Sequence, residues 1–170
     1  MISPLLDYLW PCLILGTVAG VIGGTIIRRR RLSGTRRKFG YALTALAAVL
    51  AAMAWSGPLH AADRFIAAVE PPIRQMLVHY EMTQVSAALR REPLRRQIVY
   101  QGPADEVQRS ELVRMAEEYP GVASATWNLK VRATPMVVEA SAVALFGLLL
   151  GLFIAYLIEV RRRNNAEWRW

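Results

Sequence analysis

The sequence predicts an α-helical membrane protein with three transmembrane helices and a small α+β extramembrane module of α-β-α-β order. Three observations indicate this class. Two long apolar runs flank a short arginine-rich stretch, a third apolar run precedes further arginines near the C-terminus, and the intervening segment changes between helical and strand-like periodicity. A helix needs about 20 apolar residues to cross a hydrocarbon core of roughly 30 Å, and each run supplies them.

The first predicted span covers about residues 9–27 and contains no charged side chain. Gly16, Gly20 and Gly24 recur at every fourth position, which leaves a bare strip on one helical face where another backbone can approach. We expect this strip to pack against a helix, although glycine is also simply common in membrane helices. The single cysteine, Cys12, lies in this span, so an internal disulfide and a cysteine metal cluster are excluded.

A basic loop at residues 28–39 joins the first span to a second at about 40–59. Seven of the chain's 21 Lys/Arg residues fall in residues 28–38. Because Lys and Arg near span ends favour the cytoplasm, this loop and the basic tail after residue 160 are both expected inside, with the N-terminus and residues 61–134 outside. The residues expected to set topology and meet lipid headgroups are Arg28, Arg29, Arg30, Arg31, Arg36, Arg37, Lys38, Arg161, Arg162 and Arg163.

The second and third spans differ in composition. The span at 40–59 is alanine-rich and therefore weakly hydrophobic for its length, which favours shielding by other helices over full lipid exposure. The span at about 136–160 is the longest and most apolar. Its Gly147, Gly151 and Ala155 repeat the small-residue spacing of the first span, so we expect a packed bundle rather than three separate anchors.

These spans divide the chain into residues 1–60 with two helices, the module at 61–134, and residues 135–170 with the third helix and the basic tail. The net charge of +8 does not indicate a nucleic-acid partner. Residues 60–134 hold ten Lys/Arg against nine Asp/Glu, a balance of +1, so the excess sits in the loop and the tail. The expected partners are other membrane-protein subunits and anionic lipids.

The module is read from changes in periodicity. The predicted elements are a short helix at 63–69 that Pro71 and Pro72 break, a longer helix running from these prolines to near Pro93, a strand at 96–101, a helix at 106–119 and a strand at 123–131. The longer helix is assigned from an apolar stripe that extends from Ile73 to Leu89. The expected core residues are Ile98, Tyr100, Leu112, Trp127 and Leu129.

Residues 97–131, QIVYQGPADEVQRSELVRMAEEYPGVASATWNLKV, resemble the second half of a BON domain, a small αβ module of bacterial envelope proteins. The matching landmarks are a strand ending in Gly102, a helix from Glu106, and the Gly121-Val122 turn into a last strand. BON domains begin their sheet with a hairpin, whereas residues 94–101 leave room for one strand here, so we expect a truncated sheet or one completed by a neighbour. The resemblance implies binding to phospholipid surfaces or other envelope proteins.

No catalytic motif, phosphate-binding glycine loop or Cys/His cluster is present, so we expect neither an enzyme nor a cofactor. His60 and His79 are isolated and are interpreted as ordinary surface residues. The carboxylates Glu139 and Glu159 lie near the ends of the third span and are interpreted as interfacial rather than as a proton relay. A group of arginines near Glu92-Pro93 either docks an acidic partner or lipid headgroups, or forms a solvated corner: Arg90, Arg91, Arg95 and Arg96.

Two functions follow as hypotheses. The first is a non-enzymatic accessory subunit that packs in a larger photosynthetic or respiratory complex of a bacterial inner membrane. The second is a free-standing envelope sensor or phospholipid-binding protein that uses the module directly. Charged groups at mid-span, which transporters and channels need, are lacking from all three apolar runs.

Overall fold

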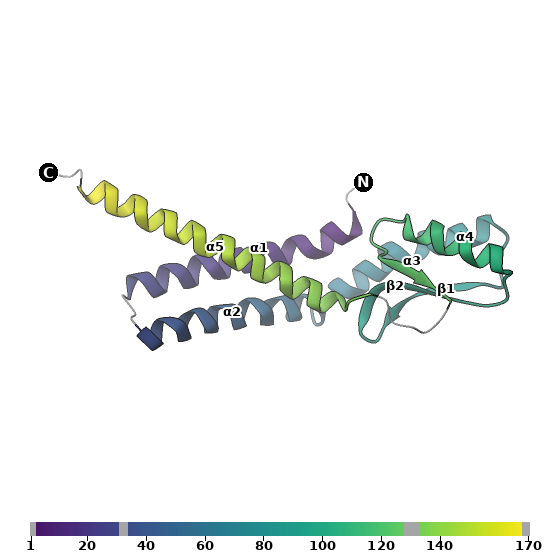
Figure 1. Ribbon diagram of the computed structural model, residues 1–170, viewed down its shortest axis with the longest axis horizontal. Helices are drawn as coiled ribbons and strands as arrows, with labels where there is room; N and C mark the ends of the chain where they lie inside the picture. The colour runs from purple at the N-terminus through teal and green to yellow at the C-terminus, as the bar shows by residue number, and fades with distance from the viewer. Residues whose placement is uncertain (1–2, 31–33, 128–132, 168–170) are drawn as a thin grey trace. The chain divides into compact units, whose positions relative to one another are not determined.

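The computed structural model describes residues 3–30, 34–127 and 133–167 and divides into two compact units (Figure 1). The helical unit comprises Leu9–Pro58 and Ala140–Trp170, and the αβ module comprises Met1–Tyr8 and Leu59–Glu139. The first eight residues were expected to accompany the first span. They instead belong to the module, where the ring of Tyr8 is buried and meets Phe65 edge-on at 5.9 Å between centroids.

Three helices are long and apolar enough to cross a membrane among the described residues: α1 (Pro4–Arg29), α2 (Gly34–Ser56) and α5 (Met136–Glu167). The expected basic loop at 28–39 is largely helical. Arginine and lysine are good helix formers, so α1 extends to Arg29 and α2 already begins at Gly34. α2 also ends at Ser56, three residues earlier than expected, and α5 continues to Glu167, beyond the expected residue 160.

The module follows the order α-β-β-α-β and not the expected α-β-α-β. Its elements are α3 (Ala61–His79), β1 (Ser86–Arg91), β2 (Leu94–Gln101), α4 (Glu106–Glu117) and β3 (Ser124–Thr126). The strands form one sheet in the order β1-β2-β3, with β1 antiparallel and β3 parallel to β2. α3 packs against β1, and α4 packs against β3.

α3 is one helix and not the expected two, although Pro71 and Pro72 lie inside it. Each proline removes a helical hydrogen bond and disfavours a straight helix. The compensating contribution comes from a stripe that crosses both prolines, because residues four apart lie on one helical face. All members of this stripe are buried: Phe65, Val69, Ile73 and Leu77.

The segment after His79 was also assigned wrongly. The apolar stripe from Ile73 to Leu89 was interpreted as one helix, but residues 86–91 form β1, which pairs with β2 as a hairpin. The exposed and buried positions of 86–89 alternate with period 2, with Ala87 and Leu89 buried, which is the pattern of a half-buried strand. The sheet therefore has the hairpin that the sequence interpretation considered missing.

One face of the sheet carries the module core. Directly paired residues share a face, and Leu89, Ile98 and Ala125 form a row of paired, buried residues across the three strands. Tyr100 is 1% exposed and its hydroxyl donates to the carbonyl of Leu112 at 3.1 Å. Burial raises the pKa of Tyr100 to about 12, so the hydroxyl keeps the proton that it donates.

Trp127 is half-buried and contacts both the core and α4. Its ring stacks on Tyr100 at 5.2 Å, lies under the Arg109 guanidinium, and donates from Nε1 to the Arg109 carbonyl. The expected strand at 123–131 is described only as far as Trp127, and within it β3 covers Ser124–Thr126; Leu129 lies outside the described residues.

Part of the opposite face of the sheet is less exposed than the alternation predicts. Gln97 and Thr126 were expected on a solvated face, yet they are 0% and 7% exposed. The chain returns along β2, where Pro135 pairs with Arg95 and the Ala133 carbonyl accepts from the Arg95 guanidinium. This return places backbone beside the edge of β2.

Gly102 ends β2 in a conformation that only glycine adopts readily. Its φ is +134°, and a Cβ there would lie 3.0 Å from the Cα of Val85 and closer still to the carbonyl oxygen of Gln84. The glycine therefore lets the start of β1 and the end of β2 approach each other closely.

Glu70 joins α3 to β1 through a buried carboxylate. It is 5% exposed, and its Oε1 accepts from the backbone N–H of Leu89 at 3.1 Å. Arg91 donates to both carboxylate oxygens at 3.3 Å, and Arg74 donates to Oε2 at 2.9 Å. A buried carboxylate needs such partners, and here they come from both elements.

We expect Glu70→Ala to destabilise the module by about 1 to 3 kcal/mol, because it leaves the Leu89 N–H buried without this acceptor. The matched control is Glu111→Ala, which removes an exposed carboxylate paired with Arg114, the kind of surface ion pair that contributes little to stability. Limited proteolysis of both variants in membranes measures the difference. Equal protection of the two variants would contradict a structural role for Glu70.

Candidate functional site

The helical unit is organised by a close contact between α1 and α5. Successive contacts advance together along both helices, from Gly16 beside Ala144 to Gly24 beside Ala155, so the two helices run parallel. At the centre of the contact, a Cβ on Gly20 would lie 3.0 Å from the Cα of Gly151. Only residues without a side chain permit this separation of two helix backbones.

The contact is reciprocal. The position that a Cβ would occupy on Gly16 and Gly20 is filled by carbonyl oxygens of α5, those of Ala144 and Leu148. The corresponding positions on Gly147 and Gly151 are filled by carbonyl oxygens of α1, those of Leu13 and Thr17. Each glycine therefore points a Cα hydrogen at a carbonyl of the other helix, the geometry of a weak Cα–H···O contact.

The predicted helix-packing residues thus lie in a contact within the chain. Gly16, Gly20 and Gly24 meet Gly147, Gly151 and Ala155 or their immediate neighbours, and these six residues are called the glycine seam below. The sequence interpretation expected a packed bundle without specifying which helix meets the glycines. Because the seam is filled by the chain's own helices, any neighbour must use other surfaces.

α2 packs with small and hydroxylated residues. Its Ala48, Ala52 and Ser56, spaced four apart, are the residues that are buried in this helix. A Cβ on Gly23 of α1 would meet the side chain of Thr44, so α1 and α2 also approach closely. The hydroxyls of Thr44 and Ser56 donate to the Gly40 and Ala52 carbonyls at 2.9 Å each, which satisfies them inside an apolar helix.

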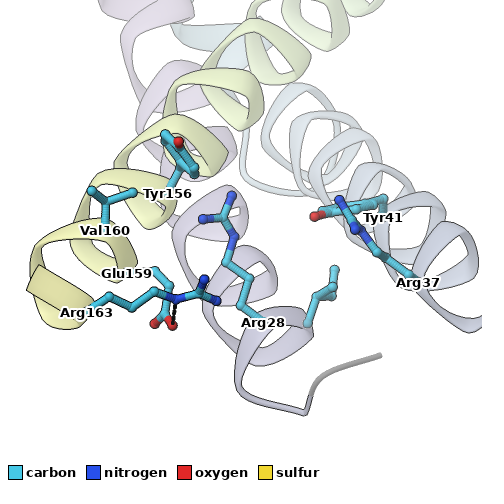
Figure 2. A pocket seen from close by; sticks show the side chains of 8 residues that line it. Arg28, Arg37, Tyr41, Tyr156, Glu159, Val160 and Arg163 are labelled. Carbon is cyan, nitrogen blue, oxygen red and sulfur yellow. Dashed lines mark hydrogen bonds and ion pairs between the residues drawn. The ribbon is translucent and has the colours of Figure 1, made fainter. Parts of the chain in front are cut away.

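A basic pocket of about 420 Å³ lies where the arginine-rich ends of α1, α2 and α5 meet (Figure 2). The lining comes from all three helices, which places the basic loop and the basic tail at the same end of the helical unit. The pocket is lined by Ile27 and Arg28 of α1, Arg37 and Tyr41 of α2, and Tyr156, Glu159, Val160 and Arg163 of α5.

Aromatic rings and one carboxylate orient the pocket's arginines. Arg28 lies over the ring of Tyr156 at 5.0 Å, and Arg37 lies over the ring of Tyr41 at 5.8 Å. Arg163 donates to Glu159 at 3.1 Å, the contact drawn in Figure 2. Glu159, which was expected at an interface beside its arginines, is 22% exposed in its side chain and also meets Arg162 at 3.9 Å.

The structure gathers only some of the predicted topogenic residues in this pocket. Arg28, Arg37 and Arg163 line it, while Arg30 and Arg36 line a neighbouring apolar cleft. Arg31 lies outside the described residues. The remaining four residues line neither cavity: Arg29, Lys38, Arg161 and Arg162.

The arginines near Glu92-Pro93 engage acceptors within the module. Arg91 pairs with Glu70, Arg95 donates to the Ala133 carbonyl, and Arg96 pairs with Glu139 at 3.4 Å. Glu139 also accepts from the Thr134 hydroxyl at 2.7 Å. Partner docking by Arg90, Arg91, Arg95 and Arg96 stays a prediction. The side chains of Arg91, Arg95 and Arg96 already bind acceptors inside the chain.

The isolated histidines also have local roles. His60 meets Asp63 at 3.0 Å at the start of α3, and His79 contacts the Tyr80 ring edge-on at 5.3 Å. Within residues 3–30, 34–127 and 133–167, no three His, Cys, Asp or Glu side chains are placed to hold a metal ion.

Two features were missed from the sequence. Glu70 was passed over because it precedes the two prolines, although the spacing of Phe65, Val69, Ile73 and Leu77 signals a continuous helix. The pairing of arginine with tyrosine in the basic pocket was also missed. Its signal in the sequence is a tyrosine about one turn inside the basic ends of α2 and α5. These are Tyr41, which follows Arg37, and Tyr156, which precedes the terminal arginines.

Comparisons with protein-family models, with curated proteins and with solved structures gave no match.

We expect Gly20→Leu to weaken the α1–α5 contact by about 1 to 2 kcal/mol, because a branched side chain separates the two backbones. The matched control is Gly57→Leu, where the nearest atom to an added Cβ is the Met53 carbonyl oxygen at the ordinary distance of 3.5 Å. Unfolding of the purified chain by detergent titration measures both. Equal stability of the two variants would contradict a seam that requires glycine.

Proposed function

We propose that this chain is a non-enzymatic accessory subunit of a larger bacterial inner-membrane complex, photosynthetic or respiratory. In this proposal the three apolar helices span the membrane, the basic pocket faces the cytoplasm and the αβ module faces the periplasm. The excess of Lys and Arg at one end of the helical unit supports this orientation.

The uncovered surface of α2 carries the proposal. α2 is the least apolar of the three candidate spans, yet only 17% of its apolar window is buried within the unit, against 28% for α1 and α5. Large apolar side chains occupy its outer face at spacings of four and three, the spacing that fits a facing helix. They are Phe39, Leu43, Leu46, Leu50 and Met53, each at least half exposed.

The glycine seam strengthens this argument. The small residues of α1 and α5 face each other and are therefore not available to a partner. The outer face of α2 is the surface that we propose a partner covers. A partner helix that covers this face would supply the shielding that a weakly hydrophobic helix needs.

The αβ module supports a role outside the membrane. Its α-β-β-α-β order includes the hairpin with which BON domains begin their sheet, and Gly102 and Gly121 both adopt positive φ at the expected turns. We propose a BON-like module that contacts neighbouring envelope proteins. The same observation favours the second candidate, a free-standing envelope sensor, because the module completes its own sheet and core.

Copurification distinguishes the two candidates. In mild detergent, the chain should migrate with a stoichiometric set of other subunits. We expect the pair Leu46→Trp/Leu50→Trp to release the chain, because bulky rings disrupt the α2 surface while preserving its apolar character. A loss of about 1 to 2 kcal/mol in helix association corresponds to a roughly tenfold or greater decrease in retained partner.

The matched control is Val18→Trp/Ile22→Trp, which alters two residues of α1 that are as exposed as Leu46 and Leu50. This pair should stay with the complex. Migration of the unaltered chain alone or as a homo-oligomer would contradict the subunit proposal and favour the sensor.

A further inference from the structure

Two cavities of different character adjoin each other at the basic end of the helical unit. The basic pocket of about 420 Å³ lies between α1, α2 and α5, and an apolar cleft of about 580 Å³ lies between α1 and α2. Ile27 lines both of them. One cavity is thus rich in positive charge, and the other is lined mainly by apolar surface.

The basic pocket has an excess of positive charge. Three arginines line it against one carboxylate, and that carboxylate, Glu159, is bound by Arg163. Arg28 and Arg37 lie over tyrosine rings and form no ion pair with any carboxylate of the described residues. Figure 2 shows both guanidinium groups beside the rings of Tyr156 and Tyr41. Guanidinium groups held in this way suit a phosphate, because their N–H donors match its oxygens in pairs.

The apolar cleft lies between α1 and α2 and shares Ile27 with the basic pocket. Gly23 and Ile26 of α1 form one wall, and Phe39 and Leu43 of α2 form the other. Arg30 and Arg36 also line this cleft, so cations accompany its apolar surface. A ligand that fills both cavities must carry an anionic group and a hydrocarbon chain.

We propose that the two cavities bind one anionic phospholipid, with its phosphate between Arg28 and Arg37 and an acyl chain in the cleft. Basic pockets between membrane helices are suited to anionic headgroups. A soluble phosphate compound would use the arginines but would leave the cleft unfilled. The site goes beyond the proposed function. It shares with it the premise that the chain spans a membrane and two residues at the basic end of the α2 face, Phe39 and Leu43.

The test uses the purified full chain in an uncharged detergent, titrated with dioleoylphosphatidylglycerol, with bound lipid counted by native mass spectrometry. We expect Arg28→Gln/Arg37→Gln to weaken binding about 25-fold, because each arginine contributes a factor of roughly five. The matched control, Arg29→Gln/Lys38→Gln, removes one charge from each of the same two helices, α1 and α2, but from residues that line neither cavity. Its binding should stay within about threefold of the unaltered chain.

A second variant tests the cleft without changing charge. Leu43→Trp should fill the cleft and weaken phosphatidylglycerol binding, whereas Val18→Trp, an exposed residue of α1 outside both cavities, should leave it unchanged. Dioleoylphosphatidylcholine should bind at least tenfold more weakly than phosphatidylglycerol, because its headgroup is neutral overall. Soluble glycerol phosphate should not displace phosphatidylglycerol, even at concentrations that would saturate a site that binds the headgroup alone.

Three results would overturn the proposal. Equal losses in the two arginine pairs would indicate diffuse attraction to positive charge. Equal binding of the two lipids would exclude an anion site. Competition by glycerol phosphate as effective as that by phosphatidylglycerol, together with normal binding to Leu43→Trp, would assign the pocket to a soluble phosphate compound. The subunit proposal is tested separately, by copurification with substitutions at Leu46 and Leu50, which line neither cavity, so failure of one proposal is distinguishable from failure of the other.

Discussion

The close approach of the α1 and α5 backbones is the constraint on which the helical unit depends. Hydrocarbon chains are as apolar as the helices, so burial from water contributes little to helix association in a membrane, and close packing must supply the stabilisation. The glycine seam provides that packing, because glycines on each helix face carbonyl oxygens on the other. The small buried residues around it, such as Cys12, Ala140 and Ala144, extend the same close contact.

The seam also determines what is left for other molecules. With the small faces of α1 and α5 turned toward each other, the outer surface of the unit consists of larger apolar side chains, including the Phe39-to-Met53 face of α2. At the basic end, the parallel course of α1 and α5 places Arg28 near Tyr156 and Glu159. The proposed partner surface along α2 and the proposed phosphate site at this end therefore both depend on one packing arrangement.

The three apolar helices and the glycine spacing could be predicted from the sequence, because hydropathy and a four-residue repeat are local signals. The partner of the seam could not, since the spacing of Gly16 and Gly20 is the same for a helix of this chain or another. The module was harder. Pro71 and Pro72 signal a break, yet the burial of Phe65 to Leu77 keeps α3 continuous, and Ala88 and Leu89 fit a helical stripe as well as a strand. Tertiary packing decides both cases.

The most direct test of the α1–α5 arrangement is disulfide formation between Gly24→Cys and Ala155→Cys in a chain that also carries Cys12→Ala. In the structure, a Cβ on Gly24 lies 2.8 Å from the Cβ of Ala155, close enough for a disulfide after a small adjustment. Oxidation should protect both thiols from a maleimide reagent. Gly24→Cys with Ala144→Cys, about three helical turns away, should leave both thiols reactive. Protection in the second pair, or in neither pair, would contradict the parallel seam.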